Sequence, residues 1–148
     1  MLLRKLRNKL YEQVRHARLT DQVSFYGPCY GEEELGPLIS MAEICVSPGE
    51  VGLTCMHAMV YGTPVITHGD ADFQGPEFEA IQPGITGCFF CRDNSNALAE
   101  AIHSWVNEKK DRDKVRADCM KTIDEFYNPF YQVKIINQAI LTVSGNSG

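Results

Sequence analysis

The chain has 148 residues, of which 44% are hydrophobic and 22% charged, and it carries a net charge of −5 with a pI near 5.3. This length and composition are typical of one globular domain with a substantial core. The acidic balance disfavours general nucleic-acid binding. No apolar run approaches the ~20 residues of a membrane span. The first residues mix charges with leucines, so no secretory signal peptide is predicted.

The N-terminal residues predict an amphipathic helix. Apolar residues at helical spacing form one face: Leu2, Leu3, Leu6, Leu10 and Val14. Cations surround it: Arg4, Lys5, Arg7, Lys9, Arg15 and Arg18. Such a run usually marks a solvated face. The alternative is contact of residues 2–18 with anionic lipid or with a neighbouring domain.

The next stretch predicts alternating strands and helices. Val23–Tyr26 is expected to be a strand that ends at Gly27-Pro28, and Glu32–Met41 a helix with acids in its first turn. Ile44–Val46 and Pro64–Thr67 are short, non-alternating apolar runs. Such runs are typical of strands covered on both faces, and they favour a parallel sheet with helical crossovers.

Between the predicted strands at 44–46 and 64–67, a glycine-bearing loop leads into a helix. Gly49 and Gly52 allow close backbone approach, and Thr54–Tyr61 has a helical apolar pattern that Gly62 ends as a C-cap. A loop that leads into a helix N-terminus is a ready anion site, because free N–H groups and the helix dipole point at the ligand. A turn that serves only packing explains the pattern equally well.

The remaining elements follow in order. We expect a polar loop at 68–76, a short helix over Glu77–Ile81, a strand over Gly87–Phe90, and helices over Asn94–Lys109, Asp113–Phe126 and Pro129–Leu141. One domain is thus expected over residues 1–142, with a disordered tail at 143–148.

Six cysteines occur, at positions 29, 45, 55, 88, 91 and 119. Cys88-Phe-Phe-Cys91 has the spacing of a redox pair or half a zinc site, but no second pair completes a metal site. On a strand, positions three apart point to opposite faces, which also disfavours shared ligation. Six reduced thiols in a cytoplasmic protein are therefore expected.

Four segments resemble one family signature: Val46-Ser-Pro48, Val51-Gly-Leu53, His57-Ala-Met59 and Gly62-Thr-Pro-Val-Ile66. In order and spacing they are similar to the C-terminal domain of retaining GT-B glycosyltransferases of group 1, or family 4. Further matches are Val23-Ser-Phe-Tyr-Gly27, Pro76-Glu77 and residues 83–90, so the resemblance runs from about residue 2 to residue 126. It implies an α/β fold: a partial Rossmann-like, three-layer domain with a short parallel sheet whose first strands are missing.

The resemblance implies a metal-independent transferase without a cofactor, whose donor is a UDP- or GDP-sugar in the cleft at the carboxyl ends of the strands. It places diphosphate oxygens on the backbone N–H groups of Val51, Gly52, Leu53 and Thr54. It also places the loop residues Gly69 and Asp70 near the sugar and phosphate. Asp70 and Asp72 together also suggest a metal site, but a solvated acidic loop is the more common meaning.

The family's pair of acids is altered here. The acid that meets the donor sugar falls on Gly49, and the acid that meets the ribose falls on His57. Glu50, one residue out of register, is expected to be the catalytic residue and to hold the sugar hydroxyls, and His57 is expected to hold the ribose. The two share a helical face if the helix starts early enough. Glu77 matches a family position but equally suits a helix N-terminus, and the role of His68 stays open.

The family's domain begins with two strand–helix units, one carrying an Arg and a Lys for the diphosphate, and it works with an acceptor-binding N-terminal half. The chain lacks both, so either its sheet closes up or one edge stays open. We therefore expect an inactive donor-binding part of a glycosyltransferase for polysaccharide or glycolipid, located in the cytoplasm or at the inner membrane face. The alternatives are a non-catalytic nucleotide or sugar-phosphate binding module, and an interaction domain that uses the basic helix.

Overall fold

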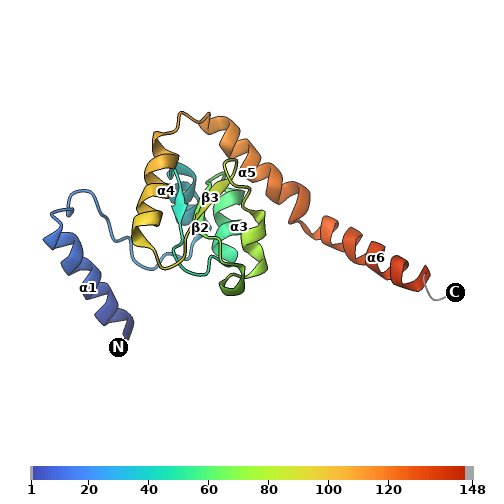
Figure 1. Cartoon of the computed structure of the whole chain (residues 1–148), viewed down its shortest axis with the longest axis horizontal. Coiled ribbons are helices and arrows are strands. Elements are labelled where there is room, and N and C mark those ends of the chain that lie inside the picture. The colour runs from blue at the N-terminus through green and yellow to red at the C-terminus, as the bar shows by residue number, and fades with distance from the viewer. Residues whose placement is uncertain (1, 146–148) are drawn as a thin grey trace. The chain divides into compact units, whose positions relative to one another are not determined.

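The computed structural model describes residues 2–145, and side chains over residues 5–142. The chain divides into two compact units, Met1–Glu34 and Leu35–Gly148, where length alone favours one (Figure 1). The second unit holds the whole sheet and the candidate site, and each unit is described by itself.

The first unit consists of a helix and an irregular segment. Helix α1 (Leu2–His16) forms as predicted, and the Tyr11 ring lies 4.1 Å from the ring of Phe25. The predicted strand at Val23–Tyr26 is wrong: this segment has no regular secondary structure. A strand exists only where a neighbour completes its ladder, and no described strand pairs with this segment. The sheet therefore does not close up with it.

A three-stranded parallel sheet forms the centre of the second unit. Its order is β1 (Cys45–Val46), β2 (Val65–His68) and β3 (Gly87–Phe90), which confirms three of the predicted strands. Cys45 pairs with Val65, and Val65 with Gly87. Within the described residues β1 has no second neighbour, so this edge of the sheet is open.

Helices cover both faces of the sheet. Helix α2 (Glu32–Met41) spans the boundary between the units and precedes β1. Helices α3 (Leu53–Val60) and α5 (Arg112–Phe126) pack on one face of the sheet and α4 (Ser95–Asn107) on the other, whereas α6 (Pro129–Gly145) follows α5 and contributes none of its described side chains to the buried core. Two short 3₁₀ turns, η1 (Ala71–Phe73) and η2 (Pro76–Ala80), replace the predicted loop and short helix.

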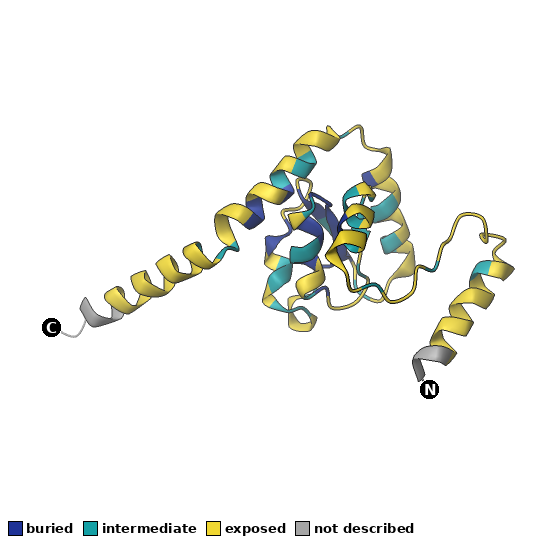
Figure 2. Cartoon of the chain, turned by 180° about the vertical axis from the view of Figure 1, so that it is seen from behind, coloured by how far each residue is buried: buried dark blue, intermediate teal, exposed yellow. Residues whose placement is uncertain are grey.

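Successive residues of β2 build two separate halves of the core. Val65 packs with residues of α3 and α5, whereas Ile66 packs with Phe90 and with Trp105 of α4. Because strand side chains alternate between faces, this division gives the predicted helix–sheet–helix layers. Figure 1 shows α3 and α4 on opposite sides of the strands, and Figure 2 shows the buried residues gathered in and around the sheet.

Helix ends follow their sequence signals. Gly62, with φ of +75°, ends α3, and the Asn94 side chain accepts a hydrogen bond from the Ala97 N–H at the start of α4. Helix α6 continues to Gly145, so it takes in the first three residues of the predicted tail, and residues 146–148 lie outside the described range. No helix among the described residues has the length and apolarity needed to span a membrane.

All six cysteines are free thiols, and two of them are fully buried. Cys55 on α3 and Cys119 on α5 are both 0% exposed within the same half of the core. Burial raises the pKa of each thiol from its ordinary 9.0 to about 12. The folded state therefore keeps both protons at pH values where an unfolded chain releases them.

We expect the free energy of unfolding to fall as pH rises from about 9 towards about 12, because only the unfolded state can ionise these thiols there. Below about pH 9 the two thiols contribute no pH dependence. Urea denaturation at several pH values measures the slope. Cys119→Ala should reduce this slope relative to the unsubstituted chain. An unchanged slope in Cys119→Ala would contradict this account.

Candidate functional site

The carboxyl ends of all three strands open at the same edge of the sheet, because the strands are parallel. Three loops leave this edge: residues 47–52 after β1, 69–75 after β2, and 91–94 after β3. In open α/β sheets, ligands bind at this edge. The predicted donor-site residues lie in the first two loops and on α3, so the structure places them at one end of the sheet.

Gly52 has a backbone conformation that side chains disfavour. Its φ is +46° and its ψ −143°, and no atom lies within 4 Å of the position that a Cβ would occupy. Glycine is therefore required there by the backbone angles and not by packing. Gly49 has equally open surroundings but no positive φ, which makes it a matched comparison within the same loop.

The backbone N–H groups of the loop divide into two pairs. The Val51 N–H donates to Gln74 Oε1 at 2.9 Å, and the Thr54 N–H donates to the Val51 carbonyl at 3.2 Å. No described residue accepts a hydrogen bond from the N–H groups of Gly52 and Leu53. Of the four donors that the sequence suggested, two are thus engaged within the protein and two adjacent ones remain at the start of α3.

Two carboxylates converge beside this loop. A Cβ at Gly75 would lie 2.5 Å from Glu77 Oε2 and 3.5 Å from Glu50 Oε1, so both acids reach the same point. Glu50 is exposed, and Glu77 is half-buried in the first turn of η2. Because α3 begins only at Leu53, Glu50 lies in the loop and does not share a helical face with His57.

His57 and Thr54 line an apolar groove. His57 is half-buried on α3, with its ring 5.6 Å from that of Tyr61. The groove has a volume of about 440 Å³, and its other walls come from α2, β1, α3 and the turns that follow the two helices: Leu35, Leu38, Ile39, Ala42, Cys45, Ala58 and Thr63. His57 and Cys45 of β1 therefore line the same groove.

A cation that the sequence did not single out lies in the third loop. Arg92 Nη1 forms an ion pair with Asp70 Oδ2 at 3.3 Å, and the guanidinium stacks 3.4 Å above the Phe73 ring. Exposed Gly69 precedes Asp70. The Asp70 N–H donates to buried His68 Nδ1 at 3.3 Å. Arg92 and His68 thus fix the conformation of the second loop.

Gln74 joins the loops that follow β1 and β2, and the sequence pattern did not single it out. Besides accepting from Val51, its amide Nε2 donates to Thr67 Oγ1 at 2.9 Å and to the His68 carbonyl at 3.0 Å. The Thr67 hydroxyl donates in turn to the Gly49 carbonyl at 3.2 Å. A glutamine in a polar loop gives no sequence signal for such a role.

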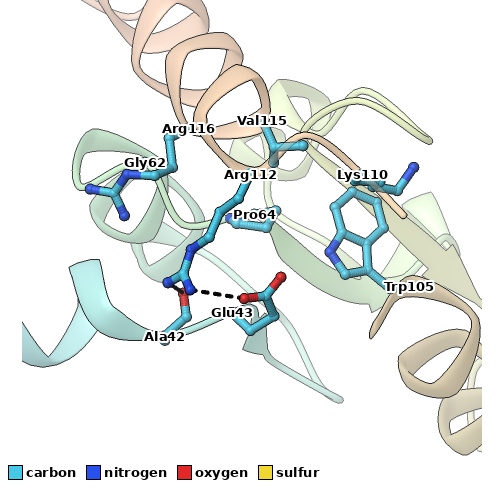
Figure 3. Close-up of a pocket in the computed structure, with 9 residues that line it drawn as sticks. All are labelled: Ala42, Glu43, Gly62, Pro64, Trp105, Lys110, Arg112, Val115 and Arg116. Carbon is cyan, nitrogen blue, oxygen red and sulfur yellow. Dashed lines mark hydrogen bonds and ion pairs between the residues drawn. The ribbon is translucent and has the colours of Figure 1, made fainter. Parts of the chain in front are cut away.

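A small cavity of about 20 Å³ lies at the amino ends of β1 and β2, at the opposite end of the strands from the candidate site (Figure 3). Arg112 pairs with Glu43 at 3.1 Å and donates to the Met41 carbonyl, and Arg116 donates to the Ser40 carbonyl. These cations are committed to the last carbonyls of α2. The cavity has room for about one water, so it is not a substrate pocket. Among the described residues, no group of three His, Cys, Asp or Glu side chains is arranged to hold a metal ion.

Comparison with known proteins identifies a family and two structures of similar fold. Residues 4–122 match the family model "Glycosyl transferases group 1". Sucrose-phosphate synthase from Thermosynechococcus elongatus has a similar fold, with a TM-score of 0.72 and 24% identity over 97% of this chain and 35% of that one. Anabaena HepE in complex with UDP and glucose gives 0.68 and 19%, over 96% and 37%. The chain thus spans little more than a third of these structures. No curated protein sequence matches it significantly.

We expect Gly52→Ala to lower the free energy of unfolding by about 1–3 kcal/mol, because alanine disfavours the observed backbone angles. Gly49→Ala, in equally open space, should change it by less than about 0.5 kcal/mol. Urea denaturation measures both variants. Equal stability of the two would mean that the loop does not hold the positive φ at Gly52.

Proposed function

The chain belongs to the group 1 glycosyl transferases, and we propose that it forms the donor-binding part of a retaining enzyme that uses a nucleotide-diphosphate sugar. The observation that carries this proposal is the pair of N–H groups at Gly52 and Leu53, which lie at the start of α3 beside two converging carboxylates. Donors for an anion and acceptors for hydroxyls are the two groups that such a ligand needs.

In this proposal the diphosphate lies at the start of α3. The Gly52 and Leu53 N–H groups donate to phosphate oxygens, and the helix dipole adds a favourable field. Negative charge grows on the leaving diphosphate as the glycosidic bond breaks, so these donors bind the transition state more strongly than the ground state. Val51 and Thr54 support the loop, with their own N–H groups engaged within the protein.

The sugar and ribose lie on either side of the diphosphate. Glu50 accepts hydrogen bonds from sugar hydroxyls, with the Glu77 carboxylate close by, and His57 bonds the ribose from its place beside the groove. Gly69 and Asp70 border the sugar from the second loop. UDP is the first nucleotide to test, because HepE with the same fold holds UDP.

The transferase activity belongs to a larger assembly. The chain spans about 35–37% of the matched structures, and in this proposal transfer also uses an acceptor-binding N-terminal half of the same enzyme. We place the whole enzyme in polysaccharide or glycolipid synthesis on the cytoplasmic side of the membrane, where basic α1 is available for peripheral lipid contact.

A second candidate function is a non-catalytic nucleotide or sugar-phosphate binding module. Gly49 and His57 favour it, since they stand where the family has two acids. The two proposals differ at Glu50. In a transferase this carboxylate contributes to turnover of the whole enzyme, whereas in a binding module its removal changes affinity for the sugar alone.

We expect titration of the full chain with UDP to shift the amide NMR signals of residues 49–54 and 57, with an affinity near millimolar, or about −4 kcal/mol. GDP serves as the competing nucleotide. Glu50→Gln should leave UDP affinity unchanged and remove any added affinity of UDP-glucose, because the carboxylate meets only the sugar. Glu79→Gln, at an exposed acid of η2, is the matched control. Shifts confined to the Arg112 edge of the sheet would refute the proposed site.

A further inference from the structure

We propose that Gln74 is a positioning residue of the donor site: it holds the glycine loop in the form that presents the Gly52 and Leu53 N–H groups. The inference rests on the proposed donor-binding function and adds a residue to which neither sequence pattern nor family match assigns a role. Gln74 touches the loop, and in this proposal it acts on the ligand only through the loop.

The Gln74 amide uses both of its ends. Oε1 accepts from the Val51 N–H at 2.9 Å, while Nε2 donates to Thr67 Oγ1 at 2.9 Å and to the His68 carbonyl at 3.0 Å. The Gly49 carbonyl lies 3.4 Å from the same nitrogen. One half-buried side chain thus links Gly49 and Val51, in the loop after β1, with Thr67 and His68 at the carboxyl end of β2.

This set of partners requires an amide. Val51 offers a donor, whereas His68 and Gly49 offer carbonyl oxygens, so the side chain must accept at one end and donate at the other. Glutamate at position 74 would direct an oxygen at both carbonyls. Leucine is apolar and satisfies none of these groups, and it would leave the Val51 N–H without its acceptor.

Thr67 completes the connection. Its hydroxyl accepts from Gln74 and donates to the Gly49 carbonyl at 3.2 Å. The Ser47 N–H donates to the Ile66 carbonyl at 2.9 Å, which extends the β1–β2 pairing to the start of the loop. The loop is therefore fixed to β2 at Ser47 and Gly49 and to Gln74 at Val51, and its free N–H groups are held in place before a ligand arrives. Such preorganisation reduces the ordering cost of binding.

The test is UDP affinity in Gln74→Leu, measured by NMR or calorimetric titration of the full chain. We expect it to fall about tenfold, the effect of one or two lost hydrogen bonds. Gln82→Leu is the matched control: Gln82 Nε2 donates to Thr122 Oγ1 at 3.2 Å, between a different turn and α5. It removes one side-chain hydrogen bond far from the loop after β1 and should leave UDP affinity within about twofold.

Hydrogen exchange separates positioning from general stabilisation. In Gln74→Leu, exchange at Val51 should accelerate while the β2 amides of Val65 and Ile66 keep their rates. Gln82→Leu should change neither the Val51 rate nor the affinity. If Gln74→Leu fails to fold, Thr67→Val takes its place, with Thr122→Val as control, and the same loss of UDP affinity is expected.

The outcomes separate the two proposals. A wild-type chain that does not bind UDP refutes the proposed function, and this inference with it. A wild-type chain that binds UDP, with variants at positions 74 and 67 that bind it equally well, overturns the role of Gln74 and leaves the proposed function intact. Equal losses in Gln74→Leu and Gln82→Leu would also overturn it, because the effect would then reflect stability alone.

Discussion

Strand β2 is the element on which the rest of the structure depends. All four of its residues are buried, and it pairs with β1 on one side and β3 on the other. Val65 and Ile66 divide the core between the two faces, and Thr67 then anchors the glycine loop. The four residues of β2 thus contribute to the core, to the strand pairing and to the candidate site. Because side chains alternate along a strand, the face that one residue occupies fixes the face of the next.

Much of the fold could be predicted from local patterns. The non-alternating run at 64–67 and the glycine at 62 carry their own signals, and strand and helix form there as expected. Val23–Tyr26 has equally apolar residues but is irregular. The difference is physical: a parallel strand depends on neighbours distant in sequence, and pattern alone cannot show whether those neighbours are present.

The candidate site divides in the same way. The glycine loop and Glu50 could be found because chain order alone places them before a helix. Gln74 and Arg92 could not, since their partners lie 23 and 22 residues away and only the folded chain brings them together. The arginines around the small cavity in Figure 3 likewise have distant partners, since they donate to the carbonyls that end α2.

Those same arginines have a consequence for how the chain is made. The carbonyls that end α2 are satisfied by donors 71 and 76 residues further along the chain. During synthesis, α2 and β1 therefore emerge from the ribosome long before the groups that complete them, and contacts of such separation form slowly. A nascent chain that stops short of Arg112 carries an unfinished α2 and an uncovered sheet face. Protease protection of stalled chains on either side of Arg116 would show whether folding waits for α5.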